Sequence, residues 1–159
     1  MGKVLEVIQN LRDRKLTLSL AESCTGGKLS ALITEHAGVS DIFLGSVVSY
    51  SNEAKAELLG VSRDTLMNEG AVSESVARQM AQGARNKLKS EYSVSITGIA
   101  GPTGGSPEKP VGTVCFAVAG TNFVESRKMK FSGSRTEIQA HACDYALQFL
   151  TEVLNKQFA

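Results

Sequence analysis

The sequence predicts a three-layer α/β/α domain built on a mixed, mainly parallel sheet of about five strands with an antiparallel edge hairpin. Helix-like and strand-like segments alternate over residues 3–97, which is typical of parallel strands joined by helices. Two strand-like segments, residues 113–120 and 122–131, then follow each other across a short turn, which is typical of a hairpin. The 159 residues correspond to about one domain, so we expect a single domain over residues 1–159.

The first half of the chain supplies two of the strands. Residues 3–14 carry apolar side chains on one helical face, and residues 16–21 alternate like a half-buried strand. Residues 28–38 return to helical spacing before a terminating glycine, and residues 42–50 are rich in β-branched and aromatic side chains. This order predicts helix, strand, helix, strand.

The second half begins with three helices and ends with one. We expect a short helix over residues 51–60 with Asn52 as its N-cap, a second over residues 62–70 and a longer one within residues 71–90. A strand over residues 92–97 leads into a glycine-rich and proline-rich loop before the hairpin. Ser134 and Glu137 have the spacing of a capping box, which predicts the start of the last helix.

Composition excludes several classes of partner. Lys and Arg number 17 against 16 Asp and Glu, so the net charge of +1 gives no field that attracts nucleic acid or an anionic membrane. No run of about 18 apolar residues and no secretory signal occur, so we expect a cytoplasmic protein without a membrane partner. The three cysteines are far apart, and we expect neither a metal nor a cofactor. Exposed apolar helix faces favour a homo-oligomer, a dimer or larger.

Three segments that contain chemically useful residues follow predicted strands. They are "ESCTGG", "YSNEAK" and "TGIAGPTGGSPEKP". In open α/β sheets, ligands bind beyond the carboxyl ends of the strands, where loops lead into helices. We therefore expect the three segments to form one binding site.

Ser23 has two possible roles, helix cap and nucleophile. Serine is a common cap, but Gly26 and Gly27 would let the backbone approach a ligand and offer N–H groups to an oxyanion or phosphate. A serine nucleophile needs a base. His36 lies at the far end of its helix and His141 within the last one, so a Ser-His-Asp triad is disfavoured, although His141 stays open.

Lys55 is the better candidate base. It lies in the first turn of a predicted helix, where the helix dipole disfavours positive charge and so favours loss of a proton. The alternative is a solvated lysine paired with a glutamate. Tyr50 ends the preceding strand and would lie beside both groups, either orienting Lys55 or stacking on a flat ring; a buried strand-end tyrosine is its alternative.

The long loop offers a second set of candidate ligand contacts. It is neither a Walker A loop nor a dinucleotide fingerprint, but an ordered glycine-rich loop can present N–H groups to anions. Lys109 and Arg135 are the nearest cations for a phosphate, and Arg135 adjoins the predicted N-terminus of the last helix.

The segments "AESCTGG", "YSNEAKAELLGV", "GAVSE", "TGIAGPTGGSPEKPVGTV" and "FSGSR" occur in the order found in the CinA C-terminal domain family, which the whole chain resembles. Members of that family include nicotinamide-nucleotide amidases. The resemblance implies a three-layer domain that hydrolyses the carboxamide of nicotinamide mononucleotide to nicotinate mononucleotide and ammonia. It implies Ser23 as nucleophile, Lys55 as base and Tyr50 as the third catalytic residue.

The resemblance also implies the residues that bind the nucleotide. They are Cys24, Thr25, Gly26, Gly27, Ser46, Asn52, Thr97, Gly98, Gly101, Gly104, Gly105, Lys109 and Arg135. Two positions depart from the family pattern: Ser46, where a glycine is usual, and Thr103, where an acidic or other polar residue is common. The alternative function is a nucleotide-sensing or partner-binding domain without turnover. A DNA-binding role, suggested by the family's link to competence, lacks a basic stripe or stacking aromatic residues here.

Overall fold

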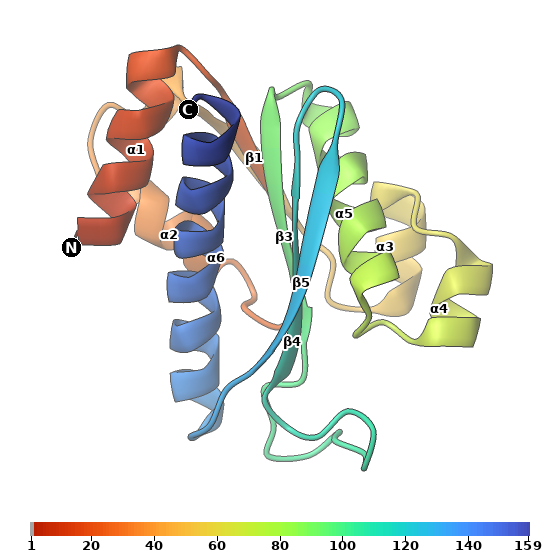
Figure 1. Ribbon diagram of the computed structural model, residues 1–159. Helices are drawn as coiled ribbons and strands as arrows, with labels where there is room; N and C mark the ends of the chain where they lie inside the picture. The colour runs from red at the N-terminus through yellow and green to blue at the C-terminus, as the bar shows by residue number, and fades with distance from the viewer. Residues whose placement is uncertain (1) are drawn as a thin grey trace.

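The computed structural model describes residues 2–159, and its centre is a five-stranded sheet with the strand order β2-β1-β3-β4-β5. The strands are β1 (Leu18–Glu22), β2 (Phe43–Val48), β3 (Tyr92–Gly98), β4 (Thr113–Ala119) and β5 (Val124–Lys130). β1 pairs in parallel with β2 and β3, whereas β4 is antiparallel to β3 and β5 (Figure 1). The predicted mixed sheet with an antiparallel edge hairpin is confirmed.

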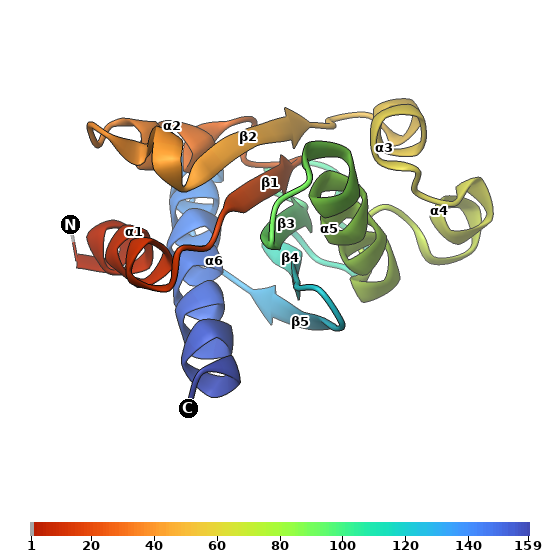
Figure 2. The same ribbon diagram turned by 90° about the horizontal axis from the view of Figure 1, so that it is seen from above.

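Helices cover both faces of this sheet, as Figures 1 and 2 show. One face carries α1 (Gly2–Arg14), α2 (Lys28–Thr34) and α6 (Arg135–Gln157). The other carries α3 (Asn52–Leu59), α4 (Arg63–Glu69) and α5 (Glu74–Leu88). A short 3₁₀ helix, η1 (Val39–Asp41), precedes β2. The three-layer α/β/α prediction is therefore correct.

Close packing of α5 fixes the central strands. Its alanines Ala77 and Ala81 are fully buried, and their backbone carbonyls accept hydrogen bonds from the side chains of Ser95 and Ser93 on β3. Small side chains on both elements allow this approach, and the bonds satisfy hydroxyl groups that would otherwise be costly to bury. The sheet is thus a firm base for the turns at its edge, where the parallel strands β1, β2 and β3 all end.

Two of the predicted helix ends are wrong. The helix over residues 51–60 is capped by Ser51, whose side chain accepts the Ala54 N–H at 3.0 Å, and Asn52 is already helical. Both residue types cap helices, and here Ser51 has the extended backbone that a cap requires. The helix predicted over residues 28–38 stops at Thr34, and Gly38, in the left-handed conformation, instead precedes η1. The capping box of Ser134 and Glu137 is confirmed.

Candidate active site

The turn after β1 presents Ser23 at the carboxyl edge of the sheet. The Ser23 N–H donates to the Ile96 carbonyl of β3 at 3.0 Å, and the Ser23 carbonyl accepts the Gly26 N–H at 3.0 Å. Gly26 and Gly27 have φ of 58° and 103°, values that glycine adopts without steric cost. The turn therefore needs both glycines, and it holds Ser23 in a nearly buried position.

Glu22, and not Ser23, caps the following helix. Its buried carboxylate accepts the N–H groups of Gly27, Leu29 and Ser30 at 3.1, 3.2 and 2.9 Å. These are the N–H groups that a helix start leaves without an intrahelical acceptor, and a negative charge is favourable there. The capping alternative for Ser23 is therefore wrong, and its hydroxyl is free for another role.

Lys55 reaches this hydroxyl from the opposite helical layer. Its Nζ donates to Ser23 Oγ at 2.9 Å and to the backbone carbonyls of Ser49 at 2.9 Å and Tyr50 at 3.3 Å. The lysine is only 1% exposed, and within residues 2–159 no carboxylate forms a salt bridge with it. The alternative of a solvated lysine paired with a glutamate is wrong.

Burial sets the protonation of the groups beside Ser23. Loss of solvation lowers the pKa of Lys55 from its ordinary value of 10.5, because the charged ammonium is the form that burial penalises. The neighbouring Cys24 thiol is buried too, which raises its pKa to about 12. At neutral pH Cys24 therefore carries no charge that would stabilise the Lys55 ammonium.

Hydrogen bonds and the backbone form a closed loop that joins Ser23 and Lys55. The Ser49 N–H donates to the Glu22 carbonyl at 2.8 Å, extending the pairing of β1 and β2 by one step. The carbonyl of the same Ser49 accepts from Lys55, which in turn donates to Ser23, the residue after Glu22. The distance between Lys55 and Ser23 is thus set by the ends of two neighbouring strands.

A cavity of about 180 Å³ opens beside this pair. The sequence-predicted residues that line it are Ser23, Cys24, Tyr50, Asn52, Lys55, Thr97, Gly98 and Arg135. They come from the three segments that the sequence places at strand ends, together with the start of α6. Ala71, Val72 and Ala100 complete the lining. Ala100 belongs to the loop that the sequence places at the site, whereas Ala71 and Val72 were missed because their small apolar side chains give no chemical signal.

Arg135 and Tyr50 bridge the rim of the cavity. One guanidinium nitrogen of Arg135 donates to the Gly101 carbonyl at 2.7 Å, and another donates to the Tyr50 hydroxyl at 2.8 Å. Tyr50 is 62% exposed, so the alternative of a buried strand-end tyrosine is wrong. Arg135 therefore connects the start of α6 with the end of β2 and with the glycine-rich loop.

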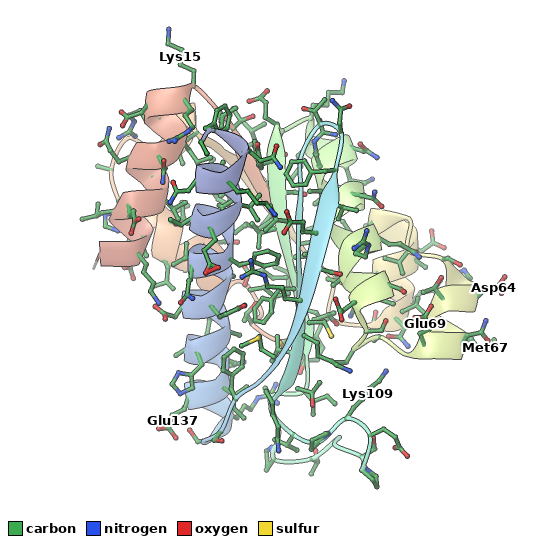
Figure 3. All side chains as sticks on the ribbon, in the orientation of Figure 1. Lys15, Asp64, Met67, Glu69, Lys109 and Glu137 are labelled. Carbon is green, nitrogen blue, oxygen red and sulfur yellow. The ribbon has the colours of Figure 1, made fainter. Side chains whose placement is uncertain are left out.

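The other sequence-predicted site residues lie outside the cavity wall. They are Thr25, Gly26, Gly27, Ser46, Gly101, Gly104, Gly105 and Lys109. The Ser46 hydroxyl accepts a hydrogen bond from Ser30 at 2.7 Å and so belongs to the α2 side of the sheet. Lys109 lies on the long loop and donates to the backbone carbonyl of Glu69 at the end of α4; both residues are labelled in Figure 3. His141 stacks on Phe131 and is not part of the cavity wall.

Two polar residues that support the turn were missed in the sequence. Glu22 precedes Ser23 directly, and a carboxylate at the start of the loop that leads into a helix is a signal that could have been recognised. Gln139 gave none: it lies in α6, far along the chain, and its side-chain amide donates to the Cys24 carbonyl at 2.9 Å. Only the three-dimensional packing of α6 on the turn identifies it.

The family model described as the CinA C-terminal domain matches residues 3–154. The chain belongs to this family. A CinA-like protein of Fervidobacterium nodosum is 48% identical over 144 residues, and a CinA-like protein of Thermotoga maritima is 45% identical over 148 residues. These alignments cover 91% and 93% of this chain but only 35% and 36% of the relatives, so the chain spans about a third of their length.

Solved structures of the CinA superfamily share the fold over their full length. The competence/damage inducible protein CihA of Agrobacterium tumefaciens is 41% identical with a TM-score of 0.91, covering 98% of this chain and 97% of that one. A CinA superfamily protein of Klebsiella pneumoniae is 34% identical with a TM-score of 0.94, covering 97% and 96%. Within residues 2–159, no helix of this CinA domain is both long and apolar enough to cross a bilayer.

Proposed function

We propose that this CinA domain is an amidohydrolase that converts nicotinamide mononucleotide to nicotinate mononucleotide and ammonia through a Ser–Lys pair, without a metal ion. The observation that carries the proposal is the 2.9 Å hydrogen bond between Lys55 Nζ and Ser23 Oγ in a buried position. A lysine whose pKa is lowered by burial can take a proton from a serine hydroxyl. The family resemblance of the motifs supplies the substrate.

Acylation begins with neutral Lys55. It takes the proton of Ser23 as Oγ attacks the carboxamide carbon, and the carbonyl oxygen becomes an oxyanion. The N–H group of Cys24 is the donor proposed for that oxyanion, because Cys24 lines the cavity and within residues 2–159 its N–H does not donate to another protein group. Protonated Lys55 then gives its proton to the amide nitrogen, the C–N bond breaks and ammonia leaves.

In deacylation, water is the nucleophile and Ser23 is the leaving group. Water attacks the ester carbon of acylated Ser23 and gives a proton to Lys55, which returns it to Ser23 Oγ as the ester bond breaks. Nicotinate mononucleotide leaves and the Ser–Lys pair is restored. Lys55 thus serves once as base and once as acid in each half of the cycle.

The cavity suits the base of the nucleotide better than the whole molecule. Its volume of about 180 Å³ is below the range of roughly 300–1,000 Å³ typical of sites that enclose a drug-sized ligand. In this proposal the carboxamide and ring enter the cavity, and the ribose phosphate lies at the rim formed by Tyr50 and Arg135. The exposed ring of Tyr50 is available there for stacking.

Ammonia release from nicotinamide mononucleotide in the presence of a chelator tests the proposal. We expect turnover by the wild type and none above background by Ser23→Ala or Lys55→Ala. Lys55→Arg should be equally inactive, because a guanidinium does not lose its proton at accessible pH. Lys28→Met, which changes an exposed lysine at the start of α2, is the matched control and should retain wild-type turnover.

The same experiment addresses the alternative function. A folded wild type that binds the nucleotide without releasing ammonia would contradict the amidase proposal and favour a sensing domain. In that case Lys55→Arg should still bind, since nucleotide binding does not require a neutral lysine. Strong, salt-dependent binding to DNA would instead favour the competence-linked role.

A further inference from the structure

We infer that Gln139 of α6 is a positioning residue that holds Cys24, the residue after Ser23 whose N–H is the proposed oxyanion donor. This inference rests on the proposed function, since it assigns the groups that stabilise the intermediate of that reaction. Gln139 lies outside the cavity wall and does not act on the substrate directly. Its contact with the site is the hydrogen bond of 2.9 Å from Nε2 to the Cys24 carbonyl.

That carbonyl belongs to Cys24, the residue that lines the cavity directly after Ser23. Because the peptide unit is planar, a hydrogen bond to the Cys24 carbonyl fixes the whole peptide plane between Cys24 and Thr25. Gln139 therefore holds Cys24 on its C-terminal side, from the helical layer of α6. α3, which carries Lys55, lies in the opposite helical layer (Figure 2).

The preceding peptide is fixed in the same way by the turn itself. The Ser23 carbonyl accepts the Gly26 N–H at 3.0 Å, which sets the direction of the Cys24 N–H. The carbonyls of both peptides are thus occupied, while within the described residues the Cys24 N–H has no protein acceptor. Cys24 is nearly buried and lines the cavity, and a buried N–H without an acceptor is costly unless a ligand takes it.

Gln139 lies among buried apolar residues, so the hydrogen bond to the Cys24 carbonyl accounts for a polar side chain at this position. The residue is only 9% exposed, and its neighbours along the same face of α6 include the buried Ala142 and Cys143. Glutamine is rarely buried in an apolar face without a hydrogen-bond partner. Gln139 holds the turn from the α6 side, while Glu22 holds it from the α2 side.

The experiment measures Ser23 reactivity and amide hydrolysis separately in Gln139→Met. Methionine has a similar length but cannot donate to the Cys24 carbonyl. A fluorophosphonate probe reports on Ser23, Lys55 and the oxyanion donor without amide cleavage: Ser23 Oγ bonds to phosphorus, fluoride leaves, the serine proton goes to Lys55, and the phosphoryl oxygen accepts the Cys24 N–H. Kinetics with nicotinamide mononucleotide then give kcat and KM.

We expect Gln139→Met to lower both the labelling rate and kcat by about tenfold to a hundredfold, with KM little changed. This decrease does not exceed the decrease in kcat that removal of one oxyanion donor causes. Leu147→Ala, a buried change about two turns further along α6, is the control for general loosening of the helix. It should label and turn over like the wild type under conditions in which both variants are folded.

Gln139→Glu is a second variant with the same shape. Its carboxyl donates to the Cys24 carbonyl when protonated but not when ionised. Its labelling rate relative to the wild type should therefore fall as the pH rises, at pH values where near-UV circular dichroism shows the folded state. A ratio that does not change with pH, together with unchanged labelling of Gln139→Met, would overturn the inference.

The outcomes separate this inference from the proposed function. A wild type that is labelled but does not release ammonia, with slower labelling of Gln139→Met, would support the inference and contradict the substrate. Wild-type turnover with an unchanged kcat in Gln139→Met, or a change in KM alone, would overturn the inference and leave the amidase in place. A wild type that is neither labelled nor active would overturn both.

Discussion

Replacing Lys55 by methionine should abolish turnover without unfolding the protein. Methionine has a similar length and no charge, so its side chain can occupy the buried position of the Lys55 side chain. Loss of a general base typically lowers the rate by about 10²–10⁴-fold, which corresponds to about 3–5 kcal/mol in activation free energy. We expect ammonia release from nicotinamide mononucleotide to fall at least this far, because in the proposed mechanism Lys55 also serves as the acid.

The stability change follows from the contacts that Lys55 makes. The substitution removes three hydrogen bonds, but the acceptors on Ser23 and Tyr50 border the open cavity, where water can replace the ammonium. The carbonyl of the buried Ser49 is left without this donor, at a cost of about 1–3 kcal/mol. Against this, removing a buried ammonium that has no carboxylate partner removes a desolvation cost of roughly several kcal/mol and so stabilises the folded state.

The free energy of unfolding of Lys55→Met should therefore equal or exceed that of the wild type. Urea denaturation followed by circular dichroism measures it, alongside the ammonia assay. Lys28→Met should change neither quantity, because that lysine is exposed. A variant that is less stable by 3 kcal/mol or more and still releases ammonia would refute the reasoning, since Lys55 would then be a structural lysine.

Four further predictions follow, two from Lys55, one from Glu22 and one from Gly83. Because burial lowers the pKa of Lys55 and the neutral amine is the base, kcat/KM should rise with pH to a plateau with its midpoint below 10.5; a midpoint at or above 10.5 would contradict this assignment. The unfolded chain keeps the Lys55 proton to higher pH than the folded one, so this group should make the unfolding free energy rise with pH between the two pKa values. Glu22→Ala leaves three N–H groups at the start of α2, including that of the N-cap Gly27, without an acceptor. It should lower the unfolding free energy by about 3 kcal/mol or more, as measured by urea denaturation; a wild-type midpoint would disprove the capping role. Gly83→Ala would place a Cβ 2.0 Å from the Leu59 carbonyl oxygen, so α3 and α5 must move apart at a cost of about 1–3 kcal/mol in unfolding free energy. An unchanged thermal unfolding midpoint would show that the two helices separate without this cost.

The sequence was sufficient for the order of elements and for the edge at which the site lies. The alternation of helical and strand-like segments placed Ser23, Tyr50 and Thr97 at the ends of strands, and the structure brings all three to one cavity. This succeeded because the carboxyl ends of parallel neighbours meet at one edge, whichever helices join them. The helix ends were less certain, since Ser51 and Asn52 are both good caps and only the backbone conformation decides between them.

The parts of the site that the sequence could not reveal depend on contacts between distant segments. Ser46 does not line the cavity, because its hydroxyl accepts a hydrogen bond from Ser30 on the α2 face. Lys109 was expected near a phosphate, yet it binds the end of α4, a contact between a loop and a helix 40 residues apart in sequence. Periodicity and motif spacing describe neighbours along the chain, and neither gives the partner of a long side chain.

The energetics of Lys55 bear on the choice between enzyme and sensor. A domain that only binds a nucleotide has no need for a neutral amine behind the cavity, and an apolar residue of the same size would be at least as stable there. The lysine is instead buried beside a serine hydroxyl and two carbonyls, with no carboxylate to stabilise its charge among residues 2–159. Such an arrangement lowers the pKa of the amine toward the range in which it can exchange protons with a hydroxyl. The loss of stability that comes with burying the Lys55 amine is expected if Lys55 is a catalytic base, and nucleotide binding alone does not explain it.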